Sequence, residues 1–207
     1  MSDPRTALVA GGYDAMIDTW EAWKDRIEDD PRAEWCKELL DRLAPGAVVV
    51  ELGCGGGTPE TRALAGRFRL TGVDLSAAQL ARARVRVPEA DYLHADLTTV
   101  ELEADSLDAV ASFYALNHVP RELLGRLFSR INTWLRSGGL LLTTLGASDV
   151  PGWTGVFLGA PSFFSGYPPE TNRRLLDEAG FTLVRDELVT IREPEGDATF
   201  HWVLARS

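Results

Sequence analysis

Lysine and cysteine are scarce in this chain of 207 residues. Only two of its 21 basic residues are lysines, Lys24 and Lys37, and no Gly-Lys-Ser/Thr sequence occurs, which excludes a P-loop for nucleotide phosphates. The two cysteines, Cys36 and Cys54, make no disulfide framework, which is typical of a reducing cytosol. Three scattered histidines add no Cys/His cluster with zinc spacing, so we expect no metal.

Long apolar runs and an excess of positive charge are also missing. No run approaches the roughly 18 apolar residues of a membrane span, and the opening Met-Ser-Asp-Pro-Arg lacks the apolar stretch of a secretory signal. Asp and Glu (31) outnumber Lys and Arg (21), which gives a formal net charge of −10 and disfavours nucleic acid as a partner. We therefore expect a cytoplasmic protein that uses neither nucleic acid nor a membrane.

The chain has enough apolar material for one folded domain. Its hydrophobic fraction of 45% is ordinary for a globular protein, and its length suits a single domain over residues 1–207. No internal repeat or low-complexity tract divides it. The arginine-rich, lysine-poor composition hints at a bacterial protein from a GC-rich genome.

Two regions with different patterns follow one another within this domain. Residues 1–44 form an expected helical cap, because Trp20, Trp23 and Ile27 recur at helical spacing. Residues 45–207 alternate strand-like and helix-like segments, which predicts an α/β fold: a doubly wound, mostly parallel seven-stranded sheet with helices on both faces. We expect strands over 47–50, 68–74, 91–94, 107–114 and 140–145, helices over 59–65, 77–86, 120–136 and 169–179, and a C-terminal antiparallel hairpin over 181–191 and 199–205.

A glycine-rich turn follows the first expected strand. Glycine permits a positive φ and lets the backbone approach a ligand closely, although many such loops are plain turns. The dinucleotide fingerprint G-x-G-x-x-G fails in both possible registers, which disfavours a dinucleotide-dependent oxidoreductase. The pattern that does fit is acidic-x-G-x-G-x-G, over Glu51, Gly53, Gly55 and Gly57.

Acidic residues also stand at the next two strand ends. Asp74 lies about 20 residues beyond the glycines, where a carboxylate is suited to hold two ribose hydroxyls. The alternative for Asp74 is a helix N-cap, a role that Ser76 already fills. Asp96 follows the third strand, and taken alone it would be a solvated loop carboxylate. Three acidic residues at three successive strand ends indicate one ligand site.

These motifs resemble those of the class I, Rossmann-like S-adenosylmethionine-dependent methyltransferases of small-molecule type, over roughly residues 10–207. The resemblance implies S-adenosylmethionine as cofactor and S-adenosylhomocysteine as product. It places Glu51 near the α-amino end of the cofactor, Asp74 on the ribose and Asp96 on the adenine amino group. The cofactor contacts that it implies are Tyr13, Trp20, Glu51, Gly53, Cys54, Gly55, Asp74, Leu75, Gln79, Ala95, Asp96, Leu97, Phe113, Tyr114 and Asn117.

Catalytic residues are expected just past the fourth strand, where the resemblance implies that the methyl group points. Asn117 and His118 lie there, and His118 is our candidate general base because imidazole titrates near neutral pH. Tyr13, paired with Asp14, is expected to close over the cofactor with Trp20 and to orient the acceptor. The alternatives are a structural His118 and aromatic side chains that only pack the cap onto the sheet.

Residues 151–168 are rich in aromatic residues, glycine and proline, and they follow the fifth strand on the ligand side of the sheet. We interpret them as a substrate loop that acts as a lid or pocket wall, because long loops in compact domains are usually functional. The alternatives are a packing cluster and a dimer contact. The residues expected to contact the acceptor are His118, Trp153, Phe157, Phe163, Phe164 and Tyr167.

The function hypothesis is in-line transfer of a methyl group to a small-molecule acceptor, by a monomer or homodimer. Such a reaction depends mainly on alignment of the reacting atoms. The alternative is a protein that binds S-adenosylmethionine but cyclises, isomerises or only binds. The methylated atom, O, N, C or S, stays open, because thiols and enolised carbons need no base.

Overall fold

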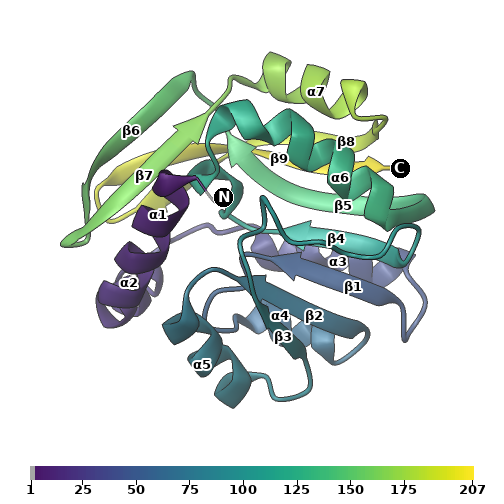
Figure 1. The fold of residues 1–207 in the computed structure, drawn as a ribbon, viewed down its shortest axis with the longest axis horizontal. Coiled ribbons are helices and arrows are strands. Elements are labelled where there is room, and N and C mark those ends of the chain that lie inside the picture. The colour runs from purple at the N-terminus through teal and green to yellow at the C-terminus, as the bar shows by residue number, and fades with distance from the viewer. Residues whose placement is uncertain (1–2) are drawn as a thin grey trace.

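A seven-stranded sheet forms the centre of the computed structural model, which describes residues 3–207 (Figure 1). The strands lie in the order β3-β2-β1-β4-β5-β9-β8. Strands β1 to β5 are parallel, and β9 pairs antiparallel with β5 and β8, which confirms the expected fold class. The strands are β1 (Val48–Leu52), β2 (Arg69–Asp74), β3 (Asp91–His94), β4 (Leu107–Ser112), β5 (Leu135–Gly146), β8 (Thr182–Glu193) and β9 (Gly196–Arg206).

Helices pack on both faces of this sheet. Successive strand residues point to opposite faces, so Val49 of β1 belongs to the apolar cluster of Trp35 and Leu64. Val50 and Leu52 belong to the other cluster, on the side of α6 and α7. The helices are α1 (Pro4–Ala15), α2 (Ile17–Lys24), α3 (Arg32–Arg42), α4 (Pro59–Ala65), α5 (Ala77–Arg86), α6 (Leu124–Trp134) and α7 (Pro169–Glu178), with short 3-10 turns η1 (Leu116–His118) and η2 (Arg121–Leu123).

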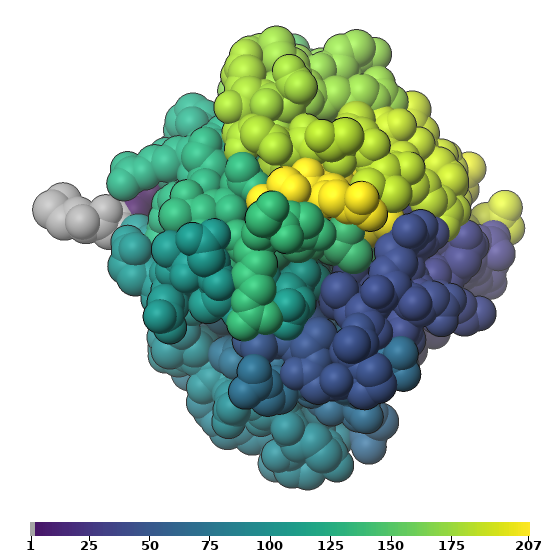
Figure 2. Space-filling view, turned by 90° about the vertical axis from the view of Figure 1, so that its right-hand side faces the viewer, coloured from purple at the N-terminus to yellow at the C-terminus, as the bar shows by residue number. Residues whose placement is uncertain are grey.

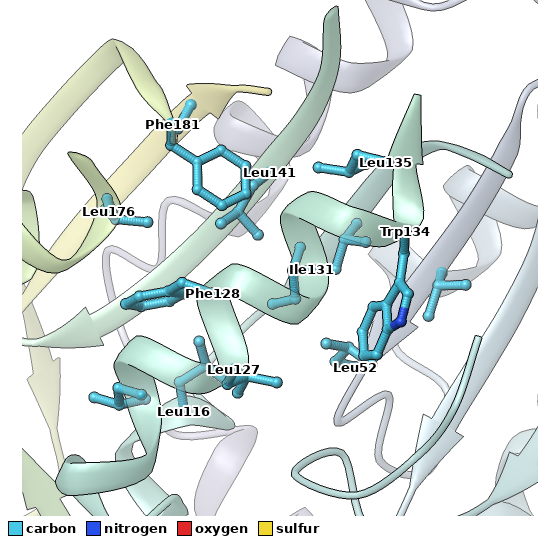
Figure 3. Packing of buried hydrophobic residues seen from close by; sticks show 14 of the residues in the cluster. Leu52, Leu116, Leu127, Phe128, Ile131, Trp134, Leu135, Leu141, Leu176 and Phe181 are labelled. Carbon is cyan, nitrogen blue, oxygen red and sulfur yellow. The ribbon is translucent and has the colours of Figure 1, made fainter. Parts of the chain in front are cut away.

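Helix α6 supplies much of the core on its side of the sheet. Phe128 and Ile131 are completely buried, and they lie with Trp134 between α6 and the strands that carry Leu52 and Leu141 (Figure 3). Burying one such side chain stabilises the fold by about 1.5–3 kcal/mol. The strong apolar stripe of this segment therefore anchors β1 and β5, whose ends form the site described below.

The expected helix over 120–136 is wrong at both ends. Its first turn is the 3-10 turn η2, and α6 ends at Trp134. Leu135 is already extended and pairs with Leu107 of β4, so β5 begins five residues earlier than expected. Gly138 and Gly139 therefore do not stop the helix; they lie at an irregularity where the β4–β5 register shifts.

Residues 151–168 are not a loop, and this expectation is also wrong. They fold into a second, two-stranded sheet of β6 (Val150–Phe157) and β7 (Ala160–Gly166), which pair antiparallel. Trp153 pairs with Phe164 across the hairpin, and Leu158 and Gly159 make the turn with positive φ angles. The many glycines and prolines concealed the alternation of aromatic residues that a strand requires.

The N-terminal segment folds into the expected helical cap, as three separate helices. Asp3 caps α1 by accepting a hydrogen bond from the Arg5 amide at 2.9 Å. Helix α1 lies against β7 and α5, and α2 follows beside the tip of the β6–β7 hairpin (Figure 1). The cap and the hairpin thus meet over the edge of the sheet where β1, β2 and β3 end.

The C-terminal residue is hydrogen-bonded to strand β5. Ser207 exchanges backbone hydrogen bonds with Gly138 and Gly139 at 3.2 and 2.9 Å. In the view of Figure 2 this end of the chain lies between the segment that starts β5 and the segment of α7 and β8. No helix within residues 3–207 is long and apolar enough to cross a membrane.

Candidate functional site

A first cavity lies at the carboxyl edge of the parallel strands, under the cap. Strand pairing brings the acidic residues to this edge: Glu51 lies opposite Gly72 of β2, and Asp74 lies opposite His94 of β3. Helix α1 covers the cavity with Thr6, Val9, Ala10 and Tyr13. The expected cofactor residues that line it are Tyr13, Trp20, Glu51, Gly53, Cys54, Gly55, Asp74, Leu75, Gln79, Asp96, Leu97, Phe113 and Tyr114.

Two expected cofactor residues lie elsewhere. Ala95 packs against the core cluster of α6 instead of facing the first cavity. Asn117 lines a second, neighbouring cavity. Ala95 and Asn117 each follow a strand end that contributes residues to the first cavity. Neighbouring side chains in such turns point in different directions, so these two do not face that cavity.

The glycine turn after β1 is tightly constrained at Gly53. Its φ is +74°, and a Cβ there would lie 2.2 Å from the Cβ of Ala115. The amides of Gly53 and Cys54 both donate to the carbonyl of Val73, at 2.7 and 3.2 Å. The turn therefore lies between β2 and the segment after β4, and only glycine fits its first position.

Asp74 connects the glycine turn to helix α5. Its carboxylate accepts hydrogen bonds from the amides of Gly55 (2.8 Å) and Ser76 (2.9 Å). Burial raises the pKa of Asp74, and these two hydrogen bonds oppose the rise. Ser76 caps α5 as expected, and its hydroxyl donates to Asp14 at 2.5 Å. The Tyr-Asp pair of α1 is thereby tied to the start of α5.

Glu51 is a buried carboxyl group with an unused oxygen. It is only 2% exposed, and its Oε2 has no hydrogen-bond partner within residues 3–207. Burial raises its pKa to about 8, while the positive charge of Arg32 acts in the opposite direction. Such a group costs stability unless a cation or donor arrives to pair with it.

Gln79 and Asp96 present further unpaired atoms to the first cavity. Both amide atoms of Gln79 lack partners in the described part of the chain, although the side chain is 1% exposed. Asp96 accepts the amide and the hydroxyl of Thr98 on Oδ1, at 2.8 and 2.7 Å, and its Oδ2 has no partner there. This cavity therefore holds several buried atoms that a bound ligand could satisfy.

Tyr13 and His118 form a hydrogen-bonded pair between α1 and η1. The Nδ1 of His118 lies 2.9 Å from the carbonyl oxygen of Phe163, which can only accept, so Nδ1 carries the proton. Nε2 then accepts the hydroxyl of Tyr13 at 2.8 Å. Burial lowers the pKa of His118 to about 4 and raises that of Tyr13. Both ring nitrogens of His118 are therefore engaged, with the ring neutral.

We expect His118 to remain neutral from pH 8 to pH 5, with its proton on Nδ1, because burial opposes the charged ring. Two-dimensional NMR of the histidine ring nitrogens checks both points, and a His118→Gln variant identifies the signals. A His118 signal that titrates near its ordinary value of about 6.5 would contradict this arrangement.

A second cavity adjoins the first below the β6–β7 hairpin. The two share six lining residues, Tyr13, Trp20, Lys24, Arg32, Tyr114 and His118. The second cavity holds about 400 Å³ and the first about 130 Å³. Volumes of about 300–1,000 Å³ are usual for small-molecule sites. The second cavity is therefore roomy enough for a small ligand beside the first.

The hairpin residues that we expected at the acceptor site separate into two groups. Phe157 and Phe164 line the second cavity, and Trp153 packs on Phe164 at 5.7 Å while remaining 45% exposed. Phe163 is buried on the other side of its strand, with the Arg5 guanidinium over its ring. Tyr167 packs against the core and under Arg121. Only His118, Phe157 and Phe164 of the expected set face this cavity.

Sequence reasoning missed the charged residues that the cap contributes. Glu21 lines the first cavity, and Lys24 and Arg32 line both. Because these three residues lie in polar helical segments, their spacing in the sequence did not indicate that they face the cavities. Among residues 3–207 no group of three His, Cys, Asp or Glu side chains is arranged to hold a metal ion.

Comparisons with known proteins agree with this geometry. Residues 49–139, which include all three acidic strand ends, match the family model of a methyltransferase domain. A trans-aconitate 2-methyltransferase from Variovorax paradoxus is 38% identical over 133 residues, which are 61% of this chain and 49% of that protein. The chain thus spans about half the length of this relative.

Solved methyltransferase structures share the whole fold. A 1,6-didemethyltoxoflavin-N1-methyltransferase from Burkholderia thailandensis has a TM-score of 0.71 and 22% identity, and covers 99% of this chain and 87% of its own. Magnesium protoporphyrin IX methyltransferase from Synechocystis, with bound S-adenosylhomocysteine, has a TM-score of 0.75 and 16% identity. The match covers 98% of this chain and 99% of that protein. The fold is that of a class I, Rossmann-like methyltransferase. The resemblance to the class I S-adenosylmethionine-dependent methyltransferases is thereby confirmed.

Proposed function

We propose that the chain is an S-adenosylmethionine-dependent methyltransferase, with the cofactor in the first cavity and a small-molecule acceptor in the second. The observation that carries the proposal is the set of buried atoms without partners in the described chain, on Glu51, Gln79 and Asp96, around one cavity. Leaving a buried polar atom unpaired costs about 1–3 kcal/mol. A ligand with matching polar groups removes that cost.

The chemistry of these side chains fits the parts of the proposed cofactor. Asp96 Oδ2 is an acceptor for the adenine amino group, and Asp74 offers its remaining lone pairs to the ribose hydroxyls. Glu51 fits the α-ammonium group, because its buried carboxylate needs a cation. Arg32, whose charge already acts on Glu51, fits the carboxylate of the same amino acid.

The chain's contribution to the reaction is mainly position. The bound sulfonium supplies an electrophilic methyl group. Tyr13 and Trp20, which form an edge-to-face pair at 5.4 Å, border both cavities and place aromatic faces beside it. Such faces stabilise a cation by about 0.5–2 kcal/mol. Alignment of two bound reactants accounts for about 7–11 kcal/mol of a barrier.

Relatives support a small molecule as acceptor. The curated relative acts on trans-aconitate, and one structural neighbour methylates 1,6-didemethyltoxoflavin. The second cavity, which Phe157 and Phe164 border, has the size and the apolar wall for such a compound. The acceptor of this chain is therefore proposed to be a small molecule, and not a protein or nucleic acid.

Calorimetric titration tests the cofactor assignment. We expect micromolar binding of S-adenosylmethionine and no binding of NAD, because the glycine turn lacks the dinucleotide pattern. Asp96→Asn replaces an acceptor by a donor at the adenine end and should weaken binding at least tenfold. Asp91→Asn, at the exposed start of strand β3, which precedes Asp96, is the matched control. A folded, ligand-free protein that does not bind S-adenosylmethionine contradicts the proposal.

A further inference from the structure

The surface shared by the two cavities is where the reacting atoms would meet, and among residues 3–207 it contains no carboxylate. Its six residues are two tyrosines, a tryptophan, a histidine, a lysine and an arginine. Glu21, Glu51, Asp74 and Asp96 line the first cavity alone. Glu193 lines the second cavity alone. Glu193 is therefore the carboxylate on the acceptor side, and the shared surface itself offers none as a general base for an alcohol or amine acceptor.

His118 is not available as that base. Its Nδ1–H donates to Phe163, and its Nε2 accepts the hydroxyl of Tyr13. A proton taken up at Nε2 would have to displace Tyr13, in surroundings that disfavour the charged ring. Burial also keeps Tyr13 and Tyr114 in their protonated forms, so both act as donors.

Lys24 is the cation with unused capacity at this surface. Its ammonium lies 3.4 Å from Glu21, a long contact, and Glu21 is also paired with Arg86 at 2.7 Å. The Lys24 side chain is only 15% exposed. Arg32, the other cation of this surface, contacts Asp30 at 2.8 Å through Nε and Nη2 and is assigned above to the carboxylate of the cofactor. Two of the three ammonium hydrogens of Lys24 therefore remain for an anion.

A closed circle of six aromatic rings walls the second cavity. Each ring contacts the next, so the wall is continuous from α1 and α2 to the hairpin. The centroid separations are Tyr13–Trp20 5.4 Å, Trp20–Trp23 5.3 Å, Trp23–Phe157 5.4 Å, Phe157–Phe164 5.4 Å, Phe164–His118 4.6 Å and His118–Tyr13 5.2 Å. Such a wall favours a flat, apolar body over a flexible polar one.

We propose, on the basis of the function proposed above, that the acceptor is a planar unsaturated acid that is methylated on its carboxylate and held by Lys24. A carboxylate arrives already ionised, so no base is required. One carboxylate oxygen forms the bond to the methyl carbon, the carbon–sulfur bond breaks, and its electron pair stays on sulfur. The sulfonium and carboxylate charges cancel, and no proton is released.

Calorimetry with trans-cinnamate tests this assignment, on protein first saturated with S-adenosylhomocysteine. We expect trans-cinnamate to bind at least tenfold more tightly than cinnamamide or cinnamyl alcohol, which have the same planar body without the charge. Lys24→Met should remove this preference when it is measured on variant protein that is itself saturated with S-adenosylhomocysteine. Lys37→Met, which removes the only other lysine from an exposed position on α3, should retain the preference.

Three outcomes have distinct meanings. Equal binding of acid and amide, or a Lys24→Met variant that prefers the acid as the parent does, overturns the acid assignment alone. Failure of S-adenosylhomocysteine to bind in the first titration contradicts the proposed function itself. In weakly buffered turnover assays the acid should give a methyl ester with no proton released. Methylation of cinnamyl alcohol with one proton released per methyl group would also overturn the assignment.

Discussion

The affinity of the chain for S-adenosylmethionine is expected to rise with pH, by about eightfold from pH 6 to pH 7 and less steeply from pH 7 to pH 8. The cause is Glu51, whose pKa of about 8 keeps the free protein's carboxyl group protonated over this range. Binding of the α-ammonium group favours the carboxylate, so one proton must leave Glu51 as the cofactor binds. The equilibrium is therefore displaced toward binding as protons become scarcer.

The increase should end close to pH 8. Above that pH Glu51 is already ionised in the free protein, and the α-amino group of the ligand begins to lose its own proton, at a pKa of about 7.7–8.0. The expected profile therefore has a maximum near pH 8, with about a twentyfold loss of affinity at pH 6. S-adenosylhomocysteine carries the same amino acid and should show the same profile.

Titration calorimetry in two buffers with different ionisation enthalpies measures the proton directly. Near pH 7 we expect a net release of about 0.8 proton for each cofactor bound, because the amine of the free ligand takes up a small part of what Glu51 releases. Glu51→Gln cannot ionise and should bind weakly with no rise between pH 6 and pH 8. Asp96→Asn should bind weakly but keep the rise, because it changes only the adenine end. A parent protein whose affinity is flat from pH 6 to pH 8 would place the ammonium group away from Glu51.

The centre of this site was predictable because it depends on backbone rules. Parallel strands end at one edge, so the acidic residues at the carboxyl ends of β1, β2 and β3 had to meet. The glycine at position 53 marks a positive φ that few other residues adopt. These features require only strand order and local geometry, which sequence patterns carry.

The residues that the cap and the hairpin contribute to the cavities were not predictable in the same way. Lys24 and Arg32 reach the site only because α2 docks beside the hairpin and α3 packs on the central sheet, and docking depends on tertiary packing. Within the hairpin, Phe163 and Phe164 point to opposite faces because the segment is a strand. Reading residues 151–168 as a loop removed the alternation that distinguishes them. The hydrogen bonds of both His118 ring nitrogens are likewise made by Tyr13 and Phe163, which lie far away in sequence.

Two adjacent glycines of α1 should respond oppositely to the same substitution. Gly11 is exposed with no atom within 4 Å of an added Cβ, whereas an added Cβ at Gly12 would lie 2.2 Å from the carbonyl oxygen of Pro161 in β7. Gly11→Ala should raise the free energy of unfolding by about 0.8–1.0 kcal/mol, because alanine favours a helix. Gly12→Ala gains the same propensity but forces α1 away from the hairpin.

The displacement of α1 should act on the cofactor more than on the core. Helix α1 covers the first cavity with Thr6, Val9, Ala10 and Tyr13, so its contact with β7 affects how tightly a bound cofactor is enclosed. Overpacking of this kind costs about 1–3 kcal/mol, and 1.4 kcal/mol is tenfold in an equilibrium constant. It also shifts Tyr13, the next residue, from its hydrogen bond with His118.

We therefore expect Gly12→Ala to release S-adenosylhomocysteine at least tenfold faster than Gly11→Ala in stopped-flow measurements. Equal release rates for the two variants would mean that the contact between α1 and β7 does not hold the cap closed.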